Sequence, residues 1–156
     1  MHTTIITAPS SAMATDATIP VVFLAGGITS CWDWQAELIS RLEGISAYLV
    51  NPRRDNWDMS DENAAEAQIA WEHAWLMRSD LVAFWFPDET LCPITLFELG
   101  TLSDRLATPI CVATHPLYAR RFDVVSQMAL RKPRLRVGES LEELAVEIER
   151  WVLRSL

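Results

Sequence analysis

Strand-like and helix-like segments alternate about five times along the 156 residues, without an internal repeat. This alternation predicts an α/β fold in which a parallel sheet of about five strands is covered by helices on both faces. A chain of this length fits one compact domain, and its 50% hydrophobic content is enough to bury a core. We expect residues 19–156 to form that single domain. Residues 1–18 are rich in Thr, Ala and Ser and lack a continuous apolar segment, which indicates a flexible tail rather than a signal peptide.

The strands are predicted from short apolar runs. The run that follows Pro20 stops at Gly26, and the run from Leu81 to Phe86 is apolar throughout and stops at Pro87, as expected of buried parallel strands. The full set of expected strands is 20–25, 47–50, 81–86, 109–113 and 135–137.

The helices are predicted from the spacing of apolar residues and from capping residues at their starts. Ser60 and Asp61 can cap the second helix, Ser140 can cap the last one, and Thr95 opens the third. The expected helices are 33–42, 60–78, 95–106, 120–130 and 140–153. Ligands of such sheets bind beyond the carboxyl ends of the strands. The segments to inspect for a site are therefore 26–32, 51–57, 86–98 and 114–122.

Composition excludes several classes of function. There are 13 Lys and Arg against 21 Asp and Glu, a net charge of −8, which argues against binding to a nucleic acid polymer or an anionic membrane. No apolar run approaches the ~20 residues that a membrane helix needs. The three cysteines are widely spaced and the three histidines lack ligand spacing, so we expect reduced thiols, no metal site and a cytoplasmic location. The glycine-rich fingerprints of dinucleotide and P-loop sites are missing, and we expect no cofactor.

The most informative stretch runs from the strand at 81–86 into the helix that follows it. Thr95 and Glu98 match a capping box, in which each side chain bonds the other residue's amide. The same position also allows a chemical role, because a carboxylate in the first turn of a helix lies in a positive dipole field that keeps it ionised. At the mouth of the sheet, Glu98 could then act as a nucleophile on an electrophilic carbon.

Two further groups lie near expected strand ends. On the helix before the central strand, Gln68 and Glu72 share one face next to two tryptophans, and the Glu72 charge there needs a partner or an aqueous cleft. After the second strand comes Asn51-Pro-Arg-Arg54, and Arg53 and Arg54 are expected either at a solvated edge or holding a phosphate or active-site carboxylates. Trp32, Trp34 and Trp57 are candidates either for the core or for stacking on a flat base.

Taken together, these fragments resemble the nucleoside 2-deoxyribosyltransferase family, including its nucleoside N-glycosidase relatives. The resemblance runs from about residue 21 to 131 and depends on the order and spacing of the fragments. They are Val22-Phe-Leu-Ala-Gly-Gly27, Asp33-Trp-Gln35, Asn51-Pro-Arg-Arg54, Gln68-x-x-Trp-Glu72, Ser79-Asp80, Phe84-Trp-Phe-Pro87 and Phe97-Glu-Leu-Gly100.

The resemblance implies a Rossmann-like or flavodoxin-like fold and a retaining double displacement on a nucleoside or nucleotide. Glu98 would be the nucleophile at C1′, with Glu72 assisting at the sugar or base and Asp88 handling the leaving base. The remaining substrate-binding positions would be Gly26, Gly27, Trp32, Asn51, Arg53, Arg54, Gln68 and Thr95. Cys92-Pro93 replaces the small polar turn common in the family, which puts phosphate binding there in doubt.

The resemblance also implies partners and leaves alternatives open. The partners would be a nucleoside or nucleotide, a free nucleobase, and a second copy of the chain that completes the pocket, with Tyr118–Asp123 as a candidate contact. One alternative is a glycohydrolase of a nicotinamide- or ADP-ribose-containing nucleotide, which the Arg53-Arg54 pair would favour. Another is a non-catalytic nucleotide-binding module in which Glu98 only caps its helix.

Overall fold

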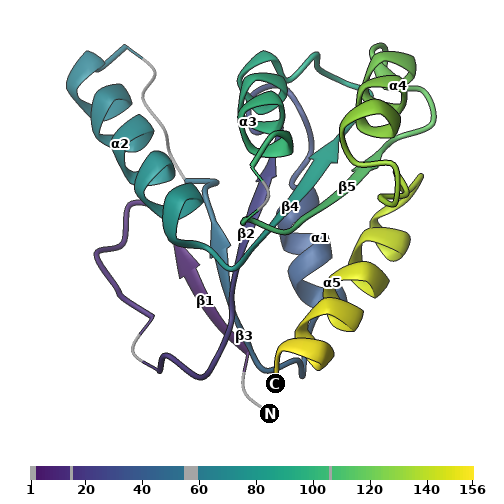
Figure 1. The fold of residues 1–156 in the computed structure, drawn as a ribbon. Helices are drawn as coiled ribbons and strands as arrows, with labels where there is room; N and C mark the ends of the chain where they lie inside the picture. The colour runs from purple at the N-terminus through teal and green to yellow at the C-terminus, as the bar shows by residue number, and fades with distance from the viewer. Residues whose placement is uncertain (1–2, 15, 55–59, 106) are drawn as a thin grey trace.

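A five-stranded parallel sheet lies at the centre of the protein (Figure 1). The structure is a computed structural model and describes residues 3–14, 16–54, 60–105 and 107–156. The strands, in the order β1-β3-β2-β4-β5 across the sheet, are β1 Thr3–Thr7, β3 Ala47–Asn51, β2 Val21–Gly26, β4 Leu81–Phe86 and β5 Ile110–Thr114. The helices are α1 Trp34–Arg41, α2 Glu62–Arg78, α3 Pro93–Ser103, α4 Arg121–Arg131 and α5 Leu141–Ser155. This architecture confirms the predicted Rossmann-like or flavodoxin-like α/β fold.

The helices form a layer on each face of the sheet, and each layer buries its own core. Helices α2, α3 and α4 pack on one face, where Trp75, Leu99 and Met128 meet strand residues such as Phe84. Helices α1 and α5 lie side by side on the other face, where Trp34 and Ile148 are fully buried. Because both faces are covered, β2 and β4 are apolar along nearly their whole length, which is the pattern that predicted them.

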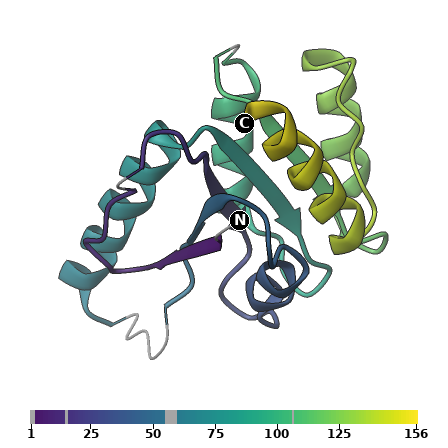
Figure 2. The ribbon, with the colours of Figure 1, turned by 90° about the horizontal axis from the view of Figure 1, so that it is seen from below.

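The N-terminal residues correct one expectation. Residues 3–7, expected in a flexible tail, form strand β1, which pairs in parallel with β3 from Thr3 opposite Ala47 to Thr7 opposite Asn51. Figure 2 shows β1 in purple, away from α4 and α5 in green and yellow. The physical reason is that Ile6 is buried in the core and that the Thr3 hydroxyl donates to the Ile45 carbonyl at 2.8 Å.

The segment 135–137 corrects a second expectation, because it is not a strand. The bridge to the sheet comes only at the next residue, where Gly138 pairs with Ala113. Leu135 and Val137 instead pack against the core on the α4 side. The sheet thus has the expected number of strands, with β1 in place of 135–137.

Most helix starts confirm the capping residues. The Asp61 carboxylate accepts from the amides of Asn63 and Ala64, and the Ser140 hydroxyl accepts from the Glu143 amide. Helix α3 differs, because it begins at Pro93 and not at Thr95. None of the helices in the described residues is long and apolar enough to cross a membrane.

A pair of glycine substitutions tests this packing. A Cβ at Gly26 would contact the Trp34 ring and lie 2.5 Å from the Trp85 carbonyl oxygen, whereas a Cβ at Gly100 in α3 meets nothing within 4 Å. We expect Gly26→Ala to lower the free energy of unfolding by about 2–3 kcal/mol. Gly100→Ala should raise it by about 0.5–1 kcal/mol, because alanine restricts the unfolded chain. Urea unfolding of both variants measures the difference, and equal stability of Gly26→Ala and the wild type would contradict the packing described.

Candidate functional site

The two central strands mark the point where the chain reverses its direction of winding. After β2 the chain crosses to β3 on one side, and after β4 it crosses to β5 on the other side. The loops 27–33 and 87–92 follow these two strands, so they meet at the carboxyl edge where ligands of such sheets bind. The predicted site residues lie on these loops, at the end of β3 and on helices α2 and α3.

Gly27 allows the two loops to touch. A Cβ at Gly27 would lie 2.8 Å from the Cys92 sulfur and 3.0 Å from Thr90 Cγ2, and the Gly27 amide donates to the Cys92 sulfur. At Gly26 the corresponding space is filled by the Trp34 ring. Protein atoms therefore already occupy the space next to both glycines. Contact of either glycine with a substrate stays a prediction.

The Arg53 side chain is directed toward the loop 27–33. It donates to Gln35 Oε1 at 2.9 Å, to Ile28 O at 3.1 Å and to Trp32 O at 2.9 Å. It also forms an ion pair with Asp33 at 3.2 Å, and its side chain is only 15% exposed. Its donors are thus largely occupied by protein acceptors, which indicates a positioning role. Asn51 starts this arrangement, because its side chain accepts from the Arg53 amide at 3.0 Å.

The candidate tryptophans differ in how deeply their side chains are buried. Trp34 is fully buried and donates from Nε1 to the Gly27 carbonyl at 2.7 Å, so it belongs to the core. Trp32 is 45% exposed on the same loop, and the Glu89 carboxylate accepts from its amide at 3.4 Å. Trp57 lies outside the described residues. Trp32 is thus the described candidate that a flat ligand can reach.

The start of helix α3 overturns the capping box. Cys92 is the N-cap, in the left-handed conformation with φ 49° and without a side-chain capping bond, and Pro93 is the first helical residue. Thr95 is therefore the third residue of the helix and is buried, and Glu98 is the sixth, in the second turn. Glu98 is too far from the helix start to cap it, and the dipole argument for an ionised carboxylate loses its basis.

Glu98 and Glu72 form a carboxyl pair between α3 and α2. Burial, and after it the nearby Glu72 carboxylate, together raise the pKa of Glu98 to about 8. Burial also raises the pKa of Glu72, while a hydrogen bond from Gln68 opposes that shift. The Glu98 carboxyl has no hydrogen bond or ion pair with the residues that the structure describes. At neutral pH the raised pKa favours the protonated form of Glu98.

Gln68 joins the Glu72 carboxylate to the end of β3. Its amide nitrogen donates to Glu72 Oε1 at 2.7 Å and to the Pro52 carbonyl at 2.9 Å. The Gln68 Oε1 atom is buried and has no hydrogen-bond partner among the described atoms. The sequence analysis placed Gln68 and Glu72 on one helix face, and the structure confirms that they are in contact.

Asp88 has a neighbour that the sequence analysis missed. Its carboxylate lies 3.5 Å from Nδ1 of His115, and both side chains are a little over one-third exposed. His115 follows β5 directly, so its position after a strand was the signal that could have identified it. Tyr118, a candidate oligomer contact, is buried and donates to the Leu91 carbonyl at 2.7 Å, so it ties the loop after β5 to the loop after β4.

The structure thus brings most of the predicted residues to one edge of the sheet. Glu98, Glu72 and Gln68 form one cluster, and Arg53, Asn51 and the loop 27–33 form a second beside it. Within the described ranges, no three His, Cys, Asp or Glu side chains gather in a way that could hold a metal ion. A large groove lies elsewhere, between β5 and α5, and no predicted site residue lines it.

Comparison with known protein families gives a match to residues 19–116. The family model described as "Nucleoside 2-deoxyribosyltransferase like" matches residues 19–116, which include β2 to β5, the carboxyl pair and His115. A search of curated proteins finds no match.

The buried carboxyl predicts a pH-dependent stability. Because the pKa of Glu98 rises from 4.5 to about 8 on folding, the unfolded chain loses this proton first, and stability falls as the pH rises between these values. We expect the free energy of unfolding of Glu98→Gln, relative to that of the wild type, to increase by about 2 kcal/mol between about pH 5 and about pH 9. This is less than the full pKa shift would give, because the side chain is half-buried. Urea unfolding across this range measures it, with the exposed Glu66→Gln as control. A difference that stays constant with pH would contradict the assignment.

Proposed function

The chain belongs to the nucleoside 2-deoxyribosyltransferase-like family, and we propose that it cleaves or exchanges the N-glycosidic bond of a nucleoside or nucleotide. The observation that carries this proposal is the half-buried carboxyl pair of Glu98 and Glu72 beside the carboxyl edge of the sheet. Pairs of carboxyl groups with raised pKa values are typical of sites that move protons and form glycosyl esters.

The proposed reaction is a double displacement. A Glu98 carboxylate oxygen attacks C1′ of the sugar, the C1′–N bond breaks, and the base leaves with the electron pair and takes up a proton. A second base or a water molecule then attacks C1′, loses its proton, and releases the Glu98 carboxylate. The sugar configuration is retained because C1′ is inverted twice.

The raised pKa of Glu98 sets a condition on this reaction. The nucleophile has to be ionised, yet at neutral pH the free protein holds a proton there. The activity should therefore rise with pH up to about 8, as the Glu98 carboxyl loses its proton. Glu72, whose carboxylate is held by Gln68, would take part in relaying that proton toward the leaving base.

Two exposed groups on the neighbouring loops support a place for the base. Trp32 offers a flat, half-exposed surface on which a base could stack. The Asp88–His115 pair offers a carboxylate and an imidazole that could protonate the leaving base. Both roles are proposals that follow from position and exposure.

The structure weakens the support for the alternative substrates. A pyrophosphate needs free positive partners, and the donors of Arg53 are already occupied by the loop 27–33 and by Gln35 and Asp33. A non-catalytic module with Glu98 as a helix cap lacks its premise, because α3 begins five residues before Glu98. A neutral nucleoside therefore fits the described site better than a dinucleotide.

We also propose that a second copy of the chain covers the exposed apolar side chains next to Glu98. Phe97 is 74% exposed on α3 and Phe122 is 83% exposed on α4, an uncommon exposure for such large side chains. Leu91, Ile94 and Leu117 are exposed on the same side of the sheet. Of the expected contact 118–123, Tyr118 faces the interior and Phe122 faces outward, so the proposed contact centres on Phe97 and Phe122.

Turnover of a substrate panel tests the activity. We expect free base, or a new nucleoside when a second base is added, from a panel of deoxynucleosides, ribonucleosides, monophosphates and nicotinamide dinucleotide. Glu98→Gln should lower kcat by about a thousandfold or more with its fold retained, and Glu66→Gln should change kcat by less than about twofold. Chromatography of the products gives both results. Absence of turnover of every panel member by wild-type protein would overturn the proposal.

The oligomer is tested separately by its mass. We expect wild-type protein to run in solution at twice 17.6 kDa or more, and Phe97→Asp to run as a monomer because a charge cannot be buried in the interface. Leu153→Asp, at an exposed apolar position on α5, is the matched control and should keep the wild-type mass. Light scattering after gel filtration measures the masses, and a monomeric wild type would contradict the proposal.

A further inference from the structure

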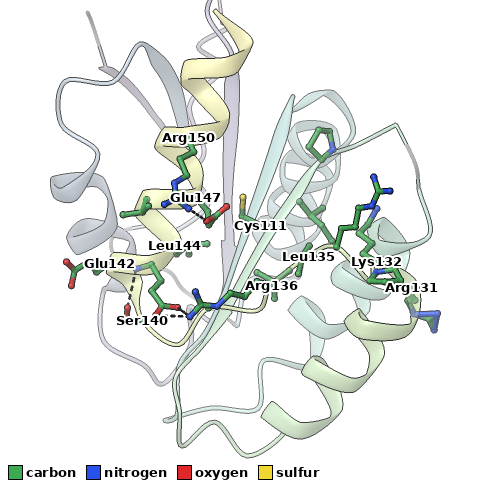
Figure 3. A pocket seen from close by; sticks show the side chains of 18 residues that line it. Cys111, Arg131, Lys132, Leu135, Arg136, Ser140, Glu142, Leu144, Glu147 and Arg150 are labelled. Atoms are coloured by element: carbon green, nitrogen blue, oxygen red, sulfur yellow. Dashed lines mark hydrogen bonds and ion pairs between the residues drawn. The ribbon is translucent and has the colours of Figure 1, made fainter.

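A large groove lies along the free edge of the sheet. It has a volume of about 1120 Å³ and runs between α5 and the segment 131–136, with β5 as its floor. Figure 3 shows Arg150, Glu147 and Leu144 on the α5 side and Arg131, Lys132 and Leu135 on the other, with Cys111 of β5 between them. No residue assigned to the proposed reaction lines this groove.

The floor of the groove is a strand edge with open backbone groups. The Val82 amide donates to the Pro109 carbonyl, and the His115 amide donates to the Phe86 carbonyl. The backbone groups of the odd-numbered residues along β5 are therefore directed toward β4. The amide and carbonyl groups of the even-numbered residues of β5 are therefore directed away from β4, toward the open edge of the sheet. Gly138 occupies the carbonyl of Val112 and the amide of Thr114 and so closes one end of the edge. Before this bridge, no strand in the described chain pairs with the outward amide and carbonyl of Ile110 or the amide of Val112.

The rim of the groove is basic although the chain is acidic. Four of the 13 Lys and Arg residues lie in the sequence Arg-Lys-Pro-Arg-Leu-Arg at 131–136, in a chain of net charge −8. Arg134 is exposed and has no ion pair with the described residues, and the Lys132 ammonium donates to the Arg105 carbonyl, which leaves its charge uncompensated. On the α5 side, Glu143 and Glu147 are paired with arginines.

We propose that this groove binds an extended acidic peptide of a partner protein, which adds to β5 as a sixth strand. The outward backbone groups of Ile110 and Val112 would bond its main chain, as in other cases of strand addition. Alternate side chains of an added strand point to opposite faces of the sheet. Acidic residues at every second position would therefore meet Lys132 and Arg134, while small apolar residues between them would face Leu144 and Cys111.

A peptide-binding experiment tests the charge requirement. The probe is a fluorescent peptide of alternating Val and Glu, and its matched control has Lys in place of Glu. We expect saturable binding of the Val-Glu peptide to the full chain and none of the Val-Lys peptide. Arg134→Glu should weaken binding about five- to tenfold, whereas Arg154→Glu, an equal charge change at an exposed position outside the groove, should change it by less than about twofold.

Amide hydrogen exchange tests strand addition itself. We expect the peptide to slow exchange of the Ile110 and Val112 amides and to leave Thr114 unchanged, because Thr114 already donates to Gly138. Equal binding of the two peptides, or binding without protection of Ile110 and Val112, would overturn the proposal. Inorganic polyphosphate is the second probe. We expect it to displace the peptide from the basic rim but, when it binds alone, to leave exchange of the Ile110 and Val112 amides unchanged. If the peptide also leaves these amides unprotected, the rim is a general anion site and not a site of strand addition.

Discussion

The Arg53 guanidinium, just after β3, donates to carbonyl oxygens of the loop after β2. The shape of the carboxyl edge of the sheet depends on these hydrogen bonds. Only arginine presents several donors in one fixed plane, so a single side chain can fix the Ile28 and Trp32 carbonyls together. Gln35 and Asp33 at the start of α1 offset the cost of keeping the charge largely out of water. With this loop fixed, Gly27 can pack against Cys92 of the facing loop.

The direction of Arg53 also shapes the electrostatics of the carboxyl pair. Its charge is turned toward the loop, and the pKa of Glu98 is set by burial and by Glu72, with no cation opposing them among the described residues. Under the proposed function, this lack of a cation beside the carboxyl pair is a reason to expect a neutral sugar and base as the substrate. The turn before α3 is Cys92-Pro93, and neither side chain offers a hydroxyl or amide group to a phosphate.

The sequence predicted the elements whose signal is local, and it failed where tertiary contacts decide. The apolar runs of β2 and β4 and the caps Asp61 and Ser140 are local signals. Strand β1 was missed because an edge strand buries few side chains, here mainly Ile6. The segment 135–137 has a strand-like pattern, but its apolar side chains cover the core instead. The start of α3 was misplaced although Pro93 is a recognised first helical residue, because Thr95 and Glu98 form a familiar pattern.

The candidate site was predictable in its members and unpredictable in its contacts. Residue type and spacing singled out Glu98, Glu72 and Gln68, yet only the fold brings α2 and α3 close enough for the two carboxyls to interact. The Asp88–His115 contact joins two loops that follow different strands, and no spacing rule connects them. The occupied donors of Arg53 likewise depend on a loop that is distant in sequence.

The pairing of β1 with β3 separates the order of synthesis from the order of assembly. Thr3 lies opposite Ala47, so β1 is synthesised before β2 and has no partner strand until β3 has been made. Strand β3 also pairs with β2. Strand β2 is buried along nearly its whole length, whereas β1 is half-exposed, so β2 buries more apolar surface in the sheet than β1 does. The pair of β2 and β3 therefore does not need β1, whereas the place of β1 at the edge depends on β3, which is synthesised later.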